Sequence, residues 1–298
     1  MAKYTLLQFQ AEYPNDAACL ARLMEINYGG TEITCPGCGV DRAKFHPMAR
    51  RRAFACQECG HHIYPAAGTI FHKSPTPLTK WFYAMYLMTS TRHGVPAKEM
   101  ERQLGVTYKC AWRMAHELRK LMASADHGGT LGGPDKPVEM DETFIGSRQK
   151  QSDRRARGSN KITVFGMVER DGGKVRVGAI PDTTKHTIEN IVVENVKLGT
   201  AINTDEHPTY IHLKDRYQHS VVNHSDKEYV RGDVHTNTIE GHWSLLKRAI
   251  AGTHNNVSAK HFWKYAAEFS YRRNYRFSHL VMFNRLVGAF ALPRLQES

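Results

Sequence analysis

The chain has 298 residues, of which 41% are hydrophobic and 10% aromatic, enough to bury at least one sizeable core and to exclude global disorder. Lysine and arginine outnumber aspartate and glutamate by 41 to 29, and this net charge of +12 favours an anionic partner, most commonly nucleic acid. The apolar runs are too short to span a bilayer and the N-terminus carries no secretory signal, so we expect a cytoplasmic protein with no membrane partner.

The first 72 residues fall into two parts with different patterns. Residues 1–30 are typical of a helical segment that closes at Gly29-Gly30. Residues 31–72 combine paired cysteines, glycines and aromatic residues without helical periodicity, which favours short strands joined by tight turns.

Four of the six cysteines lie in two Cys-x-x-Cys pairs separated by 17 residues. This spacing is typical of a four-cysteine zinc site, whereas disulfides are unusual in a reducing compartment. The glycine after each pair accepts the positive φ that such a turn needs. Four thiolates close a tetrahedral site, so we predict a structural Zn²⁺ and a zinc ribbon over residues 31–72. The predicted ligands are Cys35, Cys38, Cys56 and Cys59.

Residues 76–125 have the periodicity of a helical region. Helices over residues 97–104 and 107–121, joined at Gly105-Val106, match the helix–turn–helix layout in which the second helix enters the major groove of DNA. Thr107 is placed to cap that second helix. The alternative is an ordinary helical hairpin that packs against the apolar helix at residues 81–91.

Both regions carry side chains that suit contact with DNA. Three consecutive arginines lie between the cysteine pairs, where they either meet phosphates or form a solvated basic tip. The second helix of the helix–turn–helix candidate begins with polar, aromatic and basic residues. The residues predicted to bind DNA here are Arg50, Arg51, Arg52, Thr107, Tyr108, Lys109 and Arg113.

After a glycine-rich linker at residues 126–136, the pattern becomes that of a mixed α/β domain over residues 137–290. A turn at Asp171-Gly172-Gly173 predicts a hairpin between its flanking strands. The expected strands cover residues 138–140, 161–170, 174–180 and 201–204, and the expected helices cover residues 187–196, 238–250 and 259–275.

Three carboxylates are candidates for catalysis in this basic domain. Asp141 and Asp205 each follow a short strand, and Glu240 lies near the start of a helix. Any one of them alone is most often a cap or a surface charge. Brought together they would repel one another, and a pair of Mg²⁺ ions would relieve that repulsion. Lys247 lies two helical turns after Glu240, on the same helix face, where it can hold a DNA phosphate.

Four segments of this domain resemble the DDE-type transposases of bacterial insertion sequences, in the group that joins an N-terminal zinc ribbon to an RNase H-like catalytic domain. The resemblance covers roughly residues 18–280 and is most specific around HTNTIEG and WSLLKR. The segments are MDETFIG, VFGMVERDGGKV, INTDEHPTY and the block from VNHSDKEYVRGDVHTNTIEGHWSLLKR to HFWKY.

The resemblance implies an RNase H-like α/β fold and a DNA strand-transfer enzyme in which Asp141, Asp205 and Glu240 bind Mg²⁺, with Mn²⁺ able to substitute. Lys247 matches the family's lysine seven positions after its glutamate. Some relatives carry a different third acid or an amide, which makes Asn237 the alternative candidate. A synaptic complex that pairs two DNA ends implies a homodimer or a higher oligomer.

Residues 148–161 hold six basic residues and one acid, which favours a loop that closes over DNA, the alternative being a plain solvated loop. The further DNA contacts predicted are Arg154, Arg155, Arg157, Lys247 and Arg248. We therefore expect a transposase that recognises the terminal inverted repeats of its element and then cuts and joins DNA. The alternatives are a non-catalytic DNA-binding regulator and a nuclease of the same fold that cuts without joining.

Overall fold

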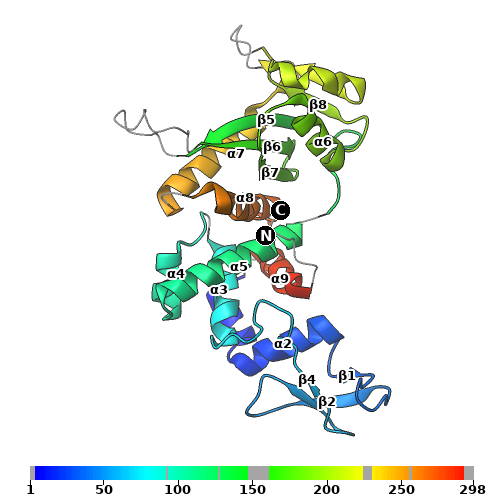
Figure 1. Ribbon diagram of the computed structural model, residues 1–298, viewed down its shortest axis with the longest axis vertical. Coiled ribbons are helices and arrows are strands. Elements are labelled where there is room, and N and C mark those ends of the chain that lie inside the picture. Colours follow the sequence, from blue (N-terminus) through cyan, green and yellow to red (C-terminus); the bar gives the residue numbers. More distant parts are fainter. Residues whose placement is uncertain are drawn as a thin grey trace. The chain divides into compact units, whose positions relative to one another are not determined.

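The structure is a computed structural model that describes residues 4–91, 93–126, 128–146, 161–223, 230–254 and 257–291. The chain divides into two compact units: the first comprises Met1–Ala125 and Tyr275–Ser298, and the second comprises Asp126–Asn274 (Figure 1). Arg154, Arg155 and Arg157 lie outside the described residues. In the part of the chain that is described, no helix combines the length and apolarity that crossing a membrane requires.

The first unit joins a small antiparallel sheet to a cluster of helices. The sheet has the strand order β1-β2-β3-β4. Its strands are β1 (Glu32–Ile33), β2 (Ala43–Pro47), β3 (Phe54–Cys56) and β4 (His62–Ile63). The helices are α1 (Leu6–Glu12), α2 (Asp16–Tyr28), α3 (Leu78–Ser90), α4 (Ala97–Leu104), α5 (Tyr108–Asp126) and α9 (His279–Gly288).

The helical segment expected over residues 1–30 is two helices. Pro14 and Asn15 separate them, because Asn15 is the N-cap of α2 and its side chain accepts a hydrogen bond from the N–H of Ala18 at 3.0 Å. Asp16, the first residue of α2, accepts hydrogen bonds from the backbone N–H groups of Leu78 and Thr79 at 3.0 and 2.9 Å. This carboxylate therefore joins α2 to the start of α3.

Helix α9 belongs to the first unit, whereas the sequence pattern places it with the domain over residues 137–290. The reason is aromatic packing: the ring of Phe283 lies 5.2 Å from that of Tyr4 and 5.8 Å from those of Phe9 and Tyr13. Such packing between the two ends of a chain leaves no local signal in the sequence.

The second unit is a five-stranded mixed sheet with the order β7-β6-β5-β8-β9. Strand β6 is antiparallel to both β5 and β7, whereas β8 runs parallel to β5 and β9 parallel to β8. This mixed α/β arrangement is consistent with the expected RNase H-like domain. The strands are β5 (Val138–Ile145), β6 (Ile162–Glu169), β7 (Val175–Ala179), β8 (Ala201–Thr204) and β9 (Gln218–Val221), and a separate hairpin pairs β10 (Val230–Arg231) with β11 (Val234–His235).

Each face of this sheet has its own hydrophobic core. On one face Met140 and Phe165 belong to the same core as Ile188 and Tyr210. On the other face Val164 and Val168 pack in a second core with residues of α7 and α8, the largest of which is Trp243. The covering elements are α6 (Lys185–Asn195) and the 3₁₀ helix η2 (Pro208–Asp215) on the first face, and α7 (Asn237–Ala249) and α8 (Ala259–Asn274) on the second; a π-helical turn η4 (Ile250–His254) follows α7.

Strand β5 is longer than the sequence predicts. The expected strand ends at residue 140, but β5 continues to Ile145 because Asp141, Glu142 and the residues after them pair with β6. Asp141 therefore lies in the middle of a strand and not at its end.

Candidate functional site

The predicted zinc ligands come together in the first unit. The four sulfur atoms of Cys35, Cys38, Cys56 and Cys59 all lie within 4.8 Å of one another. Gly39 and Gly60, the glycines after the two pairs, have φ values of 73° and 70°, as the sequence predicts. In this arrangement the backbone N–H of Gly37 donates to the sulfur of Cys35 at 3.4 Å. Four thiolates this close together fit a structural zinc ion, which takes four sulfur ligands.

The three arginines between the cysteine pairs differ in their surroundings. Arg50 and Arg51 are exposed. Arg52 is half-buried and donates to the backbone oxygens of Ser74 and Thr76 at 2.9 and 3.0 Å. Because its guanidinium is bound within the unit, Arg52 connects the ribbon to the segment before α3, and we leave it out of the DNA contacts proposed below.

Helices α4 and α5 have the helix–turn–helix layout that the sequence predicts. Helix α4 ends at Leu104 and is capped by Gly105, which has a left-handed φ of 57°. The Thr107 hydroxyl accepts a hydrogen bond from the N–H of Cys110 at 3.3 Å and so caps α5, as expected. Tyr108 and Lys109 are exposed in the first turn of α5.

Arg113, one turn further along α5, is exposed but makes contacts within the unit. Its guanidinium lies 5.3 Å from the ring centre of Trp81 and 3.4 Å from the hydroxyl of Ser74.

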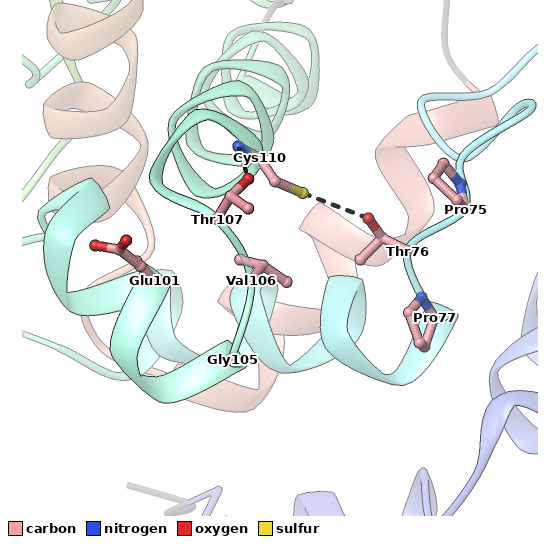
Figure 2. A pocket seen from close by; sticks show the side chains of 8 residues that line it. All are labelled: Pro75, Thr76, Pro77, Glu101, Gly105, Val106, Thr107 and Cys110. Carbon is pink, nitrogen blue, oxygen red and sulfur yellow. Dashed lines mark hydrogen bonds between the residues drawn. The ribbon is translucent and has the colours of Figure 1, made fainter.

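An open groove of about 600 Å³ lies beside the turn between α4 and α5 (Figure 2). Thr76 lines it from the segment before α3, and Cys110 lines it from α5, with the sulfur of Cys110 3.4 Å from the Thr76 hydroxyl. Glu101 supplies the one charge among the lining residues, so the groove itself does not suit a phosphate. We assign it no ligand.

In the second unit, two of the three candidate acids, Asp141 and Asp205, interact electrostatically. Strands β5 and β8 are parallel, with Val138 opposite Ile202 and Glu139 opposite Asn203. Asp141 lies two residues after Glu139 on β5, and Asp205 directly follows β8. Neighbouring strands lie about 4.8 Å apart, so the two carboxylates fall within electrostatic range of each other.

The surroundings of Asp141 favour a divalent cation. The pKa of its carboxyl is raised to about 6, chiefly by burial and also by the nearby carboxylates of Glu142 and Asp205. A hydrogen bond from the indole of Trp243 opposes this rise. A half-buried carboxylate crowded by two others is the kind of donor set that a hard cation such as Mg²⁺ stabilises. The residues present therefore fit the metal that the sequence predicts.

Glu240 does not join Asp141 and Asp205 in one tight cluster. It lies in the first turn of α7, is exposed, and its carboxylate accepts a hydrogen bond from the Thr236 hydroxyl at 2.9 Å. Among the described residues, the group of three or more metal-ligating side chains whose ligand atoms lie within 4.8 Å of one another consists of the four cysteines, and the three acids do not form a second such group. The role of Glu240 as third ligand stays a prediction.

Helix α7 is held against one side of β5 by three polar contacts at alternate strand positions. Glu139 accepts hydrogen bonds from the backbone of α7 at its first turn. Asp141 accepts one from the indole N–H of Trp243 at 2.8 Å. Thr143 accepts one from the ammonium of Lys247 at 2.6 Å. Residues at alternate positions of a strand share a face, so the contacts follow one line along the helix.

Glu139 is the residue of this site that sequence reasoning missed. Its side chain is fully buried, and it accepts hydrogen bonds from the N–H groups of Thr238 and Ile239 at 2.8 and 3.1 Å. It also forms an ion pair with Arg170 at 2.8 Å. Glu139 therefore caps the helix that carries Glu240. The one signal in the sequence was an acid between Val138 and Met140 of a buried strand.

On the other side of β5, Glu142 faces η2 as strand alternation predicts. It accepts a hydrogen bond from the hydroxyl of Tyr210, and its carboxylate lies 4.0 Å from Nδ1 of His207. Burial raises the pKa of Glu142, and the Asp205 carboxylate raises it further. Asp205 thus interacts electrostatically with acids on both sides of β5.

Comparisons with known proteins agree with these two units. Residues 14–62 match the family described as "Transposase zinc-ribbon domain", and residues 130–274 match the family described as "ISXO2-like transposase domain". The chain is also 29% identical over 259 residues to an "Uncharacterized protein in transposable element ISH50" of Halobacterium salinarum, a match that covers 81% of this chain and 85% of that protein.

A solved structure also shows a distant likeness. It is a chain of the simian T-cell lymphotropic virus intasome in complex with PP2A regulatory subunit B56 gamma, with 16% sequence identity and a TM-score of 0.29. The match covers 66% of this chain and 65% of that chain, just under two thirds of its length.

Proposed function

We propose that this chain, which belongs to the insertion-sequence transposases that join a zinc ribbon to an ISXO2-like transposase domain, acts as a DNA transposase. It binds the ends of its element, cuts one DNA strand there and joins the freed end to target DNA. The second unit carries out both reactions, and the first unit recognises the DNA end.

The observation that supports this proposal is the electrostatic interaction of Asp141 with Asp205, whose negative charge raises the pKa of the Asp141 carboxyl. We assign these two carboxylates and that of Glu240 to the metal site. A Mg²⁺ ion held by these residues would supply activation of the attacking oxygen and neutralisation of charge on the leaving oxygen of a phosphodiester, and Mn²⁺ would suit the same oxygen ligands. The chain therefore needs no serine or tyrosine nucleophile.

Lys247 has the position and the charge to hold a DNA phosphate at this site. Its contact with Thr143 fixes the ammonium beside the strand that carries Asp141. An ammonium has three donors, so two remain for a phosphate after this contact. Arg248, the exposed residue next to it, adds positive charge at the same helix end.

The basic and polar residues of the first unit supply end recognition. Arg50 and Arg51 at the ribbon tip are exposed and suit phosphate contacts. Thr107, which caps α5, and Tyr108 and Lys109 in its first turn are exposed at the end of the helix that enters a DNA groove in helix–turn–helix proteins. Arg113 lies one turn later on that helix. Assembly of two or more copies would pair two DNA ends.

One assay separates this proposal from its two alternatives. The full-length protein is incubated with Mg²⁺, a labelled DNA carrying the element end, and a target plasmid. Joined product supports a transposase, cleavage without joining would indicate a nuclease, and binding without either would indicate a DNA-binding regulator.

The matched variants in this assay are Asp141→Asn and Asp182→Asn, the second changing an exposed aspartate of the same unit that bonds to Thr184 and Thr187. Asp141→Asn should abolish cleavage and leave binding of the element end unchanged. Asp182→Asn should alter neither. Loss of DNA binding in Asp141→Asn would contradict the assignment of this residue to catalysis.

A further inference from the structure

We propose that the indole N–H of Trp243, seated over Gly166, is the positioning group that fixes the carboxylate of Asp141 for metal binding. The inference rests on the proposed function, since it gives Asp141 the role of metal ligand. Trp243 also belongs to the hydrophobic core between α7 and the sheet.

The hydrogen bond from Trp243 to Asp141 joins two elements that are about a hundred residues apart in the chain. The indole Nε1 donates to Oδ2 of Asp141 at 2.8 Å. Trp243 is 4% exposed and packs in the core between α7 and the sheet, so its ring cannot turn without disturbing that core. The carboxylate is therefore held by a rigid donor.

The second oxygen of Asp141 is also held, because Oδ1 accepts the backbone N–H of Glu142 at 2.8 Å. Each carboxylate oxygen has two lone pairs, so each keeps one for a cation after these bonds. The two donors thus fix the side-chain rotamer and leave ligand positions open.

Gly166 provides the space for the indole. It is the residue of β6 directly opposite Asp141 in the antiparallel register. A Cβ atom at this position would lie 2.4 Å from Cη2 and 2.7 Å from Cζ2 of Trp243, far inside van der Waals contact. Any side chain at 166 would therefore displace the ring and with it the N–H that bonds to Asp141. The position of the indole therefore requires glycine at residue 166.

The contact could have a purely structural purpose, because a buried indole N–H needs an acceptor and Asp141 supplies one. In that case Asp141 only satisfies the buried indole N–H of Trp243, and the hydrogen bond does not strengthen metal binding. The two interpretations differ in one measurable way: a positioning role ties the indole N–H to the occupancy of the metal site, whereas a structural role does not.

The first test observes the indole directly in the full-length protein. The chain has four tryptophans, so a ¹⁵N-labelled sample gives four indole N–H resonances, and the one lost in Trp243→Phe belongs to Trp243. Titration with Mg²⁺ alone should shift this resonance more than that of Trp263 in α8. An unchanged Trp243 resonance at Mg²⁺ concentrations that support cleavage would overturn the inference.

The second test measures Mg²⁺ affinity by calorimetry in two variants. Trp243→Phe keeps a ring over Gly166 and removes the N–H, and Gly166→Ala displaces the indole without changing it. Loss of a partner that orients a metal ligand weakens metal binding about 10- to 100-fold, and we expect this loss in both variants. The matched control is Trp263→Phe, which should bind Mg²⁺ like the wild type.

Activity assays then separate a failure of this inference from a failure of the proposed function. Trp243→Phe should raise the Mg²⁺ concentration needed for half-maximal cleavage, with excess Mg²⁺ restoring most of the rate. A wild type that neither cuts nor joins DNA would overturn the proposed function, while the indole shift would still support the positioning role. Wild-type Mg²⁺ dependence in a folded Trp243→Phe would overturn the inference alone.

Discussion

Single buried polar residues decide the geometry of the candidate site. Glu139 has no exposed surface, yet it satisfies two backbone N–H groups at the start of α7 and the guanidinium of Arg170. A buried carboxylate is stable in the folded state when it is paired and fully hydrogen-bonded, as here. The position of Glu240 in the first turn of the same helix depends on this cap.

The first prediction at this scale concerns that cap. Glu139→Gln removes the charge that Arg170 and the helix N-terminus share, and it places an amide where donors converge. Breaking a buried ion pair from one side costs about 3–5 kcal/mol, so the free energy of unfolding in urea should fall by about that amount. Glu194→Gln, on the exposed face of α6, should change it little. An unchanged unfolding midpoint for Glu139→Gln would contradict the capping role.

His242 provides a prediction about pH. The pKa of its imidazole is lowered to about 3, chiefly by burial and in part by the positive charge of Arg273. The unfolded chain binds this proton near pH 6.5 but the folded chain does so only near pH 3. The contribution of His242 to stability is thus fully present above pH 6.5 and is lost as the pH falls from about 6.5 towards 3.

Chemical denaturation of the His242→Phe variant between pH 7 and pH 4 tests this sign. The free energy of unfolding of the wild type should fall more steeply with decreasing pH than that of the variant. The exposed His186 of α6 offers a matched control in His186→Phe, which should keep the wild-type slope. Parallel curves for wild type and His242→Phe would disprove the assignment of this titration to His242.

At the scale of elements, the zinc ribbon depends on a metal and the helices do not. Its strands are two to five residues long and have few apolar side chains to bury. Small modules of this kind obtain their stability from the metal. Helices α2 and α3, by contrast, are connected through hydrogen bonds from Leu78 and Thr79 to Asp16, and each buries its own apolar side chains.

Cys56→Ser should therefore remove zinc from the protein and unfold the ribbon, while the second unit keeps its fold. Zinc content measured by atomic absorption should fall from one equivalent to near zero, and binding of the element end should weaken at least about tenfold. Cys110→Ala in α5 lies outside the cluster and should retain its zinc. Full zinc content in Cys56→Ser would show that the ribbon does not use this ligand.

For the whole molecule, charge determines how DNA binding responds to salt. The chain carries a net charge of +12, and its exposed basic residues lie in both units. Each contact between a basic side chain and a DNA phosphate releases condensed counterions when it forms. Because this release is less favourable at a higher salt concentration, the affinity for DNA falls as salt is added.

Binding of the element end by the full chain should weaken at least about 100-fold between about 50 mM and 200 mM salt. Lys109→Ala should reduce the slope of log affinity against log salt concentration by about one, as expected for the loss of one phosphate contact. Lys120→Ala, towards the other end of α5, should leave the slope unchanged. A flat salt response of the wild type would argue against broad phosphate contact. An unchanged slope in Lys109→Ala would remove α5 from the DNA interface.

The sequence by itself determined the features that depend on neighbouring residues in the chain. The zinc ligands, the turn at Gly105 with its cap at Thr107, and strand β8 with the hairpin before it follow from spacing, capping and turn residues that act over a few positions. Asp141 and Asp205 were identifiable because scarce acids stood beside apolar strands in a basic domain.

Only the tertiary structure decided the contacts between distant segments. The full length of β5, the cap by Glu139, the placement of α9 and the seat of Trp243 over Gly166 all depend on partners far along the chain. A sequence records which side chains can donate, accept or be buried. Which of them meet is set by packing the whole chain, because each contact forms only when the others hold the backbone in place.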